Sequence, residues 1–402
     1  MSDNSIKRLP IGEFIAMVAF NFAMVAFSID AMLPALPEIA EALSPDERNN
    51  AQLVVTAFVF GMGVGTFFTG PLSDRFGRKP VIAIAALVYV AGAALAYSAQ
   101  TLEQLLAARA LQGLGVAGPR VVAMALIRDI YEGRRMAQIM SYAMLIFTLV
   151  PAIAPFLGDF IIHAFGWRSI FLACILFCGL SVGWLLLRQA ETLPKAKRRS
   201  LGLGNLMAAT RECFSYRAFS LSTAVQCLTF AMLFATLSSV QQLFDVTYGH
   251  GDNFPAWFAL IALLGGSASV LNARLVMRIG MRRMIEIGLG GQVLISALML
   301  GLGVSTGLPL GLFVAWITSV FFMIGFVIGN LNALAMEPVG HIAGLAASII
   351  GSVSTVLGVI LAVPIGLMFN GTPVPLAGGI LLLALSAFVI MQQGFNRLSS
   401  QA

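Results

Sequence analysis

The chain has 402 residues, of which 59% are hydrophobic and only 10% are charged. Soluble domains carry about 25% charged residues, so this composition excludes a water-soluble protein and indicates a lipid bilayer as the surroundings. The net charge of +6 does not indicate a nucleic-acid partner, because the basic residues lie in short clusters between long apolar runs.

Twelve apolar stretches are long enough to cross a bilayer as helices, since a hydrocarbon core of roughly 30 Å needs about 20 helical residues. The first stretch is too long for the apolar part of a signal peptide, so we expect it to be the first span. The predicted fold class is an all-α membrane protein of twelve transmembrane helices. The predicted spans are residues 11–36, 51–70, 81–99, 102–127, 136–162, 169–187, 219–244, 255–277, 284–304, 308–335, 343–369 and 374–391.

The positions of lysine and arginine predict the orientation of these spans. With the N-terminus in the cytoplasm, 20 of the 24 basic residues fall in cytoplasmic segments. Only Arg48 and Arg168 fall in outer loops, and Arg109 and Arg120 lie inside a span. This bias follows the positive-inside rule, and an even number of spans returns the C-terminus to the cytoplasm.

A basic segment divides the spans into two sets of six. We expect residues 1–188 and 217–402 to form two pseudo-symmetric six-helix bundles, joined by a cytoplasmic linker at 189–216. The turns after the second and eighth spans share four positions at an offset of 203 residues, which indicates duplication of a six-span unit, as in secondary transporters. The matching positions are Leu72, Arg75, Gly77 and Lys79 in the first turn and Leu275, Arg278, Gly280 and Arg282 in the second.

The first span carries two acidic residues. If spans 1 and 4 are centred in the bilayer, Asp30 lies about 10 Å and Arg109 about 9 Å outward of the centre, so the two side chains could pair. Burial favours a neutral Asp30 and Arg109 favours a charged one, so this carboxyl could take up and release a proton. The alternative is that Asp30 only caps the outer end of the span. Glu13 is a second proton candidate, or an ordinary acid in the first turn of a helix.

The turn Gly70–Pro80 is the first strong motif. Gly77 permits the bend, and Pro80 begins the third span at a tolerated first-turn position. Asp74 lies among basic residues, so we expect charge pairing at the ends of the helices. The alternative is a loop whose basic residues only set the orientation.

The fourth span carries two arginines eleven residues apart, close to three full turns of a helix. Arg109, Gln112 and Arg120 therefore share one face, which must point to the interior because an arginine facing lipid is costly. The alternative for Arg109 is a packing role with bonds to backbone carbonyls. Arg120 is either a site for anionic groups or a partner of Glu13.

The fifth span contains Pro151, Pro155 and Gly158. Prolines free backbone carbonyls and small residues allow close approach of helices, although an ordinary kinked helix would look the same. At the inner end of the fourth span, the simplest interpretation of Arg128 and Asp129 is a local ion pair with the adjacent loop.

Several residues of the predicted central helices mix aromatic with uncharged polar side chains. Such a wall suits bulky amphipathic compounds better than sugars, although any one of these residues is equally explained by helix packing. The candidate substrate-binding residues are Asn21, Phe27, Gln112, Arg120, Tyr142, Gln226, Phe230, Phe234 and Asn330.

No sequence feature indicates an enzyme, a cofactor or a metal site. A phosphate-binding loop is absent from the sequence, so ATP is not expected to drive the protein. The three histidines are scattered, and the spacing of Cys174 and Cys178 suits packing better than a metal. We expect a monomer whose partners are a small-molecule substrate, protons and the lipid bilayer.

The turn at residues 70–80 closely resembles the motif between spans 2 and 3 of the major facilitator superfamily. In that family the aspartate of the motif helps to hold the two halves together. The resemblance therefore implies gating roles for Asp74, Arg75, Gly77 and Arg78. Arg109 followed by Gln112-Gly113 is similar to the span 4 motif of the family, which is linked to proton transfer.

Two further segments narrow the resemblance. Residues 28–37 resemble the end of span 1 in bacterial drug:proton antiporters, notably the bicyclomycin and chloramphenicol resistance branch. Span 5 is similar to the antiporter motif at Pro155 and Gly158 but has Val150 and Asp159 where glycines are expected. The partial match implies gating roles for Pro151, Pro155 and Gly158.

Together these motifs imply a proton-coupled exporter that works by alternating access in the bacterial inner membrane. Its expected substrates are small amphipathic compounds such as chloramphenicol-like antibiotics. Two alternatives stay open: a proton-coupled importer or sugar or metabolite transporter of the same fold, and a membrane sensor or assembly factor that transports nothing.

Overall fold

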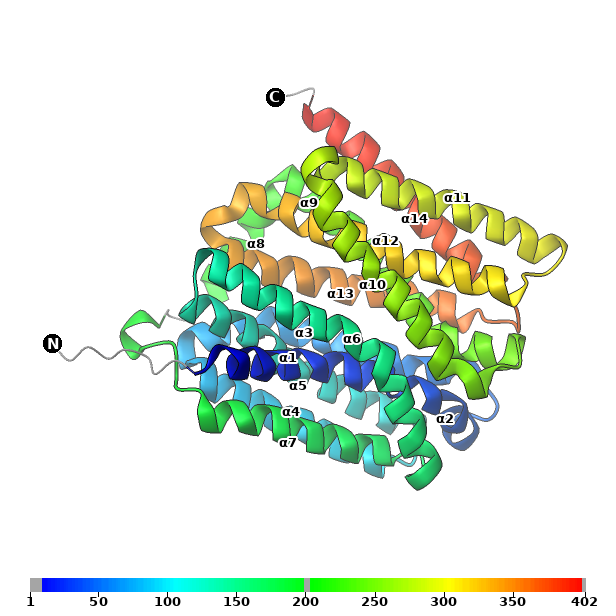
Figure 1. Ribbon diagram of the computed structural model, residues 1–402, viewed down its shortest axis with the longest axis horizontal. Coiled ribbons are helices and arrows are strands. Elements are labelled where there is room, and N and C mark those ends of the chain that lie inside the picture. Colours follow the sequence, from blue (N-terminus) through cyan, green and yellow to red (C-terminus); the bar gives the residue numbers. More distant parts are fainter. Residues whose placement is uncertain (1–8, 199–202, 400–402) are drawn as a thin grey trace.

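The protein is a bundle of long helices that run roughly parallel to its longest axis (Figure 1). The computed structural model describes residues 9–198 and 203–399, and every regular element in these residues is helical. Eleven apolar helical stretches in the described residues are long enough to cross a membrane. One of them, Leu310–Leu367, has 58 residues and folds back at η6 (Glu337–Ile342), where Val339 leaves the helical conformation. Twelve crossing helices result, as the sequence predicts.

The first six crossing helices pack mainly on one another, and so do the last six. Residues 1–8, 199–202 and 400–402 of the predicted bundles and linker lie outside the described residues. The first set is α1 (Ile11–Asp30), α3 (Leu53–Phe76), α4 (Arg78–Ser98), α5 (Leu102–Ile130), α6 (Gly133–Phe165) and α7 (Ser169–Arg188). The second set is α9 (Arg217–Gln242), α10 (Phe254–Ile279), α11 (Met281–Ser305), α12 (Leu310–Met336), α13 (Ala343–Leu367) and α14 (Val374–Ser399).

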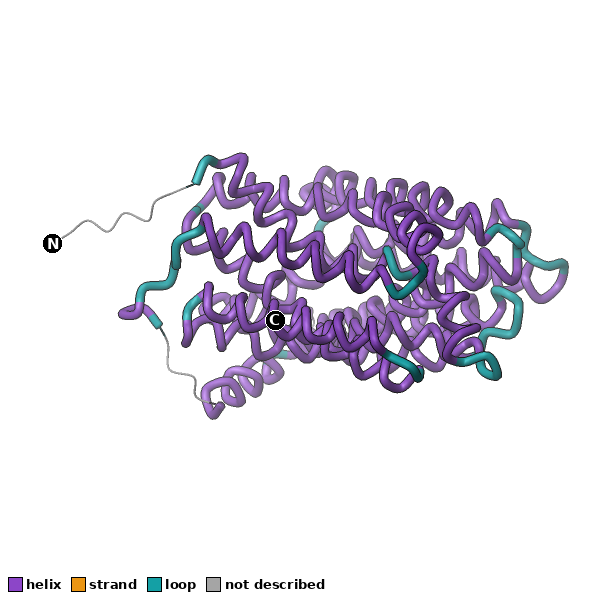
Figure 2. The backbone as a smooth tube through the Cα atoms, turned by 90° about the horizontal axis from the view of Figure 1, so that it is seen from below, coloured by secondary structure: helices purple, strands orange, loops and turns teal. Residues whose placement is uncertain are grey.

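Short elements occupy the connections between these helices. The predicted linker contains a helix that sequence reasoning did not foresee, α8, which packs on α9 and α13. The tube in Figure 2 shows the loops gathered at the two ends of the bundle. The short elements are η1 (Leu33–Ala35), α2 (Leu36–Leu43), η2 (Arg48–Gln52), η3 (Lys195–Lys197), α8 (Leu203–Ser215), η4 (Leu243–Thr247) and η5 (Gly251–Asn253).

The first crossing helix ends earlier than predicted. We expected a span to residue 36, but α1 stops at Asp30 and the chain continues as η1 and α2. Pro34 and Pro37 have no amide hydrogen, so neither can donate the helical bond to the residue four positions before it. The backbone carbonyl of Asp30 therefore receives no helical hydrogen bond from Pro34. The helix ends at this residue, and the carboxyl side chain of Asp30 lies at the helix end.

Helix α5 is the tightest part of the first set, and glycines explain why. A Cβ atom at Gly113 would overlap the carbonyl oxygen of Phe58 in α3, and one at Gly115 would overlap the backbone of Tyr89 in α4. From the opposite side, a Cβ at Gly61 would overlap the carbonyl of Ala110. Small residues let helix backbones approach closely, so α5 is fixed between α3 and α4.

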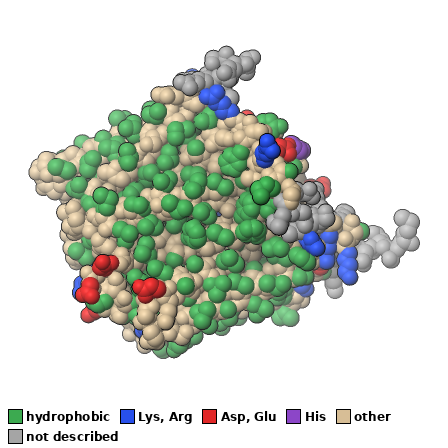
Figure 3. Space-filling view, turned by 180° about the vertical axis from the view of Figure 1, so that it is seen from behind, with side chains coloured by type: hydrophobic (Ala, Val, Ile, Leu, Met, Phe, Trp, Pro, Cys, Tyr) green, Lys and Arg blue, Asp and Glu red, His purple; other side chains and the backbone are tan. Residues whose placement is uncertain are grey.

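Two long seams join the sets: α3 packs on α13, and α6 packs on α10. Figure 3 shows hydrophobic side chains over most of one face, with charged side chains confined to its two ends and most visible lysines and arginines at one of them. Large apolar side chains such as Leu87, Leu176 and Leu294 are well exposed. Such a surface suits lipid, and the protein is a multi-pass membrane protein.

Candidate functional site

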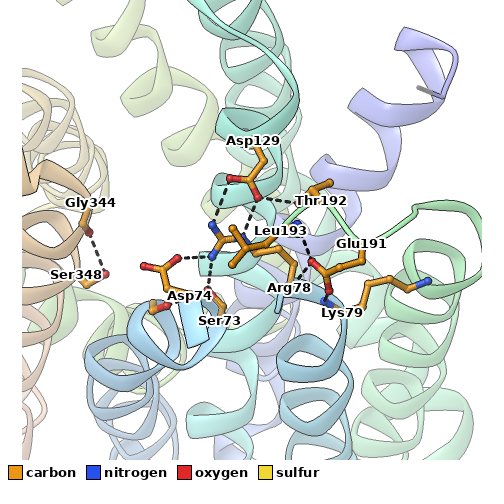
Figure 4. Close-up of polar contacts among 11 residues, drawn as sticks. Ser73, Asp74, Arg78, Lys79, Asp129, Glu191, Thr192, Leu193, Gly344 and Ser348 are labelled. Carbon is orange, nitrogen blue, oxygen red and sulfur yellow. Dashed lines mark hydrogen bonds and ion pairs between the residues drawn. The ribbon is translucent and has the colours of Figure 1, made fainter. Parts of the chain in front are cut away.

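Arg78 is the centre of a cluster at the end of the bundle where α3 ends and α4 begins, which we call the basic end (Figure 4). Its guanidinium donates to Asp74 Oδ1 at 2.6 Å and Ser73 Oγ at 2.8 Å, and its Nε donates to Asp129 Oδ2 at 2.9 Å. The predicted charge pairing of Asp74 is therefore confirmed. The ion pair expected for Asp129 also forms, and its partner Arg78 belongs to the turn at residues 70–80, 51 residues back in the chain.

The start of the linker closes this cluster. The backbone amides of Arg78 and Lys79 donate to the carboxylate of Glu191 at 3.0 and 2.9 Å, and Thr192 donates to Asp129 at 2.7 Å. Gly77, at a φ of +102°, has no side chain that could cap α4. Glu191 therefore supplies the acceptor for the free amides at the start of that helix.

Asp74 also lies toward the other set of helices. In Figure 4 its carboxylate points away from Asp129, to the side where Gly344 and Ser348 of α13 lie. One turn earlier on α3, a Cβ at Gly70 would stand 3.0 Å from Ser348 Oγ. Arg75 is exposed, with its guanidinium 5.2 Å from the centre of the Phe76 ring. Gating by these residues is consistent with this position and stays a prediction.

Four uncharged side chains join the two sets at the opposite end of the bundle. Asn49 Nδ2 donates to the carbonyls of Leu367 and Phe369 at 3.1 and 2.8 Å, and its Oδ1 accepts from Gln242 Nε2 at 2.9 Å. Gln52 Nε2 donates to Gln242 Oε1 at 2.6 Å, and Ser239 Oγ donates to Gln52 Oε1 at 3.1 Å. We call Asn49, Gln52, Ser239 and Gln242 the amide cluster. Sequence analysis missed it, because single amides carry no pattern.

Arg109 is completely buried inside the first set. Its Nη2 donates to the carbonyl of Ser28 at 2.9 Å, its Nη1 to Gln112 Oε1 at 2.7 Å and its Nε to the carbonyl of Val54 at 3.3 Å. The ring of Phe58 lies 4.4 Å from the guanidinium carbon. Arg109 thus reaches the depth of Asp30 as predicted, but it binds backbone carbonyls, which is the packing alternative.

Asp30 is the last residue of α1 and only 4% exposed. In the described chain its carboxyl has no hydrogen-bond or ion-pair partner, so the predicted pair with Arg109 is not formed. The following η1 contacts both α6 and α9, one from each set. A Cβ at Gly158 would overlap the carbonyl of Ala31, which confirms the close approach predicted for span 5. Pro151 and Pro155 lie within the continuous helix α6.

Glu13 lies at the basic end, far along α1 from Asp30. Its carboxylate accepts from Arg188 at 2.7 and 3.0 Å and from Trp184 Nε1 at 3.3 Å. The alternative that Glu13 pairs with Arg120 is therefore wrong. Arg120 is only partly buried, and its Nη1 stands 3.8 Å from the sulfur of Met62.

The remaining candidate substrate residues are not brought together in one place. In α1, Asn21 is fully buried and donates to the carbonyl of Met17, while Phe27 packs on Phe177 of α7. Asn330 of α12 donates to Asn272 of α10 at 2.9 Å. Tyr142 of α6 is 48% exposed.

One subset of the candidates does share a surface. Gln226, Phe230 and Phe234 lie four residues apart and form one stripe along α9. Phe230 and Phe234 have ring centres 5.5 Å apart, and a Cβ at Gly358 of α13 would touch Phe230. Oε1 of Gln226 is buried and has no hydrogen-bond partner, so it could accept a bond from a ligand or from water.

A cavity of about 720 Å³ opens at the basic end beside Asp129. It is lined by Leu9, Ile11, Asp129, Ile130, Tyr131, Glu132 and Arg135. The described residues contain no group of acidic, histidine and cysteine side chains that could hold a metal. The bundle therefore has an ion-pair cluster around Arg78 at the basic end and the uncharged amide cluster at the opposite end. Between these ends, Asp30 and Arg120 carry ionisable groups without an ion-pair partner in the described residues.

Comparison with known proteins gives matches over most of the chain. The family model of the Major Facilitator Superfamily matches residues 18–363. The chain is 30% identical over 381 residues to a bicyclomycin resistance protein homolog of Haemophilus influenzae, which covers 90% of this chain and 91% of that relative. It is 29% identical over 337 residues to the multidrug resistance protein MdtL of Escherichia coli K12, covering 82% and 83%.

Solved structures show the same fold. A D-xylose-proton symporter superposes with a TM-score of 0.76 at 15% identity, covering 94% of this chain and 97% of the symporter. At this identity the likeness concerns the arrangement of helices alone.

Proposed function

We propose that this chain, which belongs to the Major Facilitator Superfamily, exports small amphipathic drugs across the bacterial inner membrane in exchange for protons. Membership confirms the resemblance drawn from the turn at residues 70–80, and the chain is a transporter rather than an enzyme. The names of the two relatives, bicyclomycin resistance and multidrug resistance, support drug efflux. Exchange for protons is our inference from the residues.

The observation that carries the proton step is the isolation of Asp30. Its carboxyl is buried at the end of α1 and has no partner among the described residues, and it lies next to η1, which touches both sets of helices. A charged carboxylate without a partner is unfavourable in apolar surroundings, whereas a neutral acid is tolerated. Asp30 would therefore hold its proton while enclosed and release it once water reaches it. The charge of Asp30 would change beside a contact between the two sets of helices. A movement of one set relative to the other would therefore change the surroundings of this carboxyl.

The two ends of the bundle would act as alternating gates. The basic end faces the cytoplasm in our proposal, because Lys79, Arg128 and Arg188 lie there and positive residues favour that side. The amide cluster then closes the outer end, and the contacts of α3 with α13 near Asp74 close the inner end. Opening one end while the other closes would carry a drug outward.

The test is drug-dependent proton movement in everted membrane vesicles that contain the protein. Adding bicyclomycin or chloramphenicol to acidified vesicles should release protons with the wild type and not with Asp30→Asn. Asp46→Asn is the matched control, because Asp46 is exposed in the connection between α2 and η2. Unchanged proton release by Asp30→Asn would overturn the proton role. Proton movement with xylose instead of drugs would identify a symporter.

A further inference from the structure

Arg120 is a positive charge deep within the first set of helices. It lies ten residues before the end of α5, about 15 Å from that end by the rise of a helix. Its Nη1 is 3.8 Å from the sulfur of Met62 in α3. The side chain stays partly open to solvent, unlike Arg109, which is fully buried.

The position of Met62 places Arg120 beside the seam between the two sets. The next residue of α3 is Gly63, where a Cβ would stand 2.9 and 3.0 Å from the side chains of Val356 and Thr355 in α13. Arg120 and the other half thus contact two consecutive residues of α3. A compound held between the two halves at this depth would come within reach of its guanidinium.

No acidic side chain balances this charge in the residues that the structure describes. Glu13 is paired with Arg188, and both Asp74 and Asp129 are paired with Arg78. The polar groups of α13 at this level, such as Ser352 and Thr355, are uncharged hydroxyls. An arginine in a membrane is costly unless an acceptor or water meets it, so its guanidinium has donors available for a ligand.

We propose that Arg120 binds an anionic oxygen group of the transported compound, so that the protein prefers acidic amphipathic compounds to neutral ones and rejects cations. A planar guanidinium forms paired hydrogen bonds with a carboxylate, and it repels a positive charge in a site of low polarity. This inference rests on the proposed export function and names its substrate class.

Three dansyl probes of similar size and different charge test the proposal. Dansylglycine is an anion, dansylglycinamide is neutral and dansylethylenediamine is a cation near pH 7. Binding to the purified full chain in nanodiscs is followed by dansyl fluorescence. The wild type should bind dansylglycine about 10- to 100-fold more tightly than dansylglycinamide, the range expected for bonds to a charged group. The cation should bind most weakly.

Substitutions then assign the preference to this residue. Arg120→Gln should bind the anion and the neutral probe equally, and Arg120→Lys should keep part of the preference. Arg274→Gln removes the same charge from an exposed position of α10 and should behave as the wild type. If Arg120→Gln does not fold, the loss of preference is measured with Arg120→Met.

Two results would overturn the inference. One is a wild type that binds the cation as well as the anion, and the other is an anion preference that survives in Arg120→Gln. Bicyclomycin transport, measured in the everted membrane vesicles described above, separates this failure from failure of the proposed function. Efflux with cation preference refutes only the role of Arg120, whereas absence of any drug efflux by the wild type refutes export itself.

Discussion

Asn49 should control how readily the end of the bundle opposite the basic end opens. Its side chain makes three hydrogen bonds across the two sets, to the carbonyls of Leu367 and Phe369 and to Gln242. Each bond contributes about 0.5–1.5 kcal/mol, so Asn49→Ala should lose about 1.5–4.5 kcal/mol of closed-state stability. Water reaches this partly buried site and replaces some partners, so we expect about 1.5–3 kcal/mol. The open population should then rise about 10- to 150-fold relative to the closed one.

Spin labels on the two sets measure this population directly. Labels at the exposed positions Glu41 in α2 and Asp252 in η5 report the distance between the sets by pulsed electron resonance. The matched control is Asn370→Ala, because Asn370 lies at the same end and, within residues 9–198 and 203–399, its side chain bonds only to Thr372 of its own loop. A distance distribution for Asn49→Ala that equals that of the wild type and of the control would refute the reasoning.

Two further predictions concern stability. Glu191→Ala should lower the unfolding temperature in detergent by about 1–2 °C, since loss of a helix cap costs about 1 kcal/mol and the shift per kcal/mol falls with chain length; an unchanged temperature would show that Glu191 does not stabilise α4. Gly113→Ala should abolish or strongly reduce the yield of monodisperse protein in size-exclusion chromatography, because the added Cβ overlaps the backbone of α3. Gly291→Ala in α11 has nothing within 4 Å of the added atom and serves as its control. Equal yields of the two glycine variants would contradict the close packing of α5.

The twelve crossing helices were predictable because each is a long, continuous apolar run. The residues at which these helices end were less predictable. A helix stops where its backbone hydrogen bonds can no longer form, and this need not be where the hydrophobicity of the sequence falls. The first span shows this: Pro34 ends the regular helix near Asp30, although residues 31–36 are as apolar as those before them. Depth along a helix follows from its fixed rise, and this is why Asp30 and Arg109 were correctly placed at one level.

The hydrogen-bond partners of the polar side chains were harder to predict than the places of these side chains along their helices. Sequence places Arg109 at the right depth, but its choice of the Ser28 carbonyl over a carboxylate depends on where α1 ends. Glu191 lies 113 residues from the amide that it binds, and only the folded chain brings the two together. A weak signal existed: α4 begins directly after Gly77, which offers no cap, so another acceptor had to come from elsewhere.

The cap that Glu191 supplies to α4 also affects where the chain can be divided into two separately expressed fragments. The segment after α7 connects two sets of helices, yet its first residues complete the structure of the first set. A break before Glu191 would leave α4 in the first fragment and its acceptor in the second. A break after Arg198 would keep both in one fragment. Two fragments expressed together should therefore form the more stable complex with the second arrangement, which places the boundary between the halves within the connecting segment rather than at the end of α7.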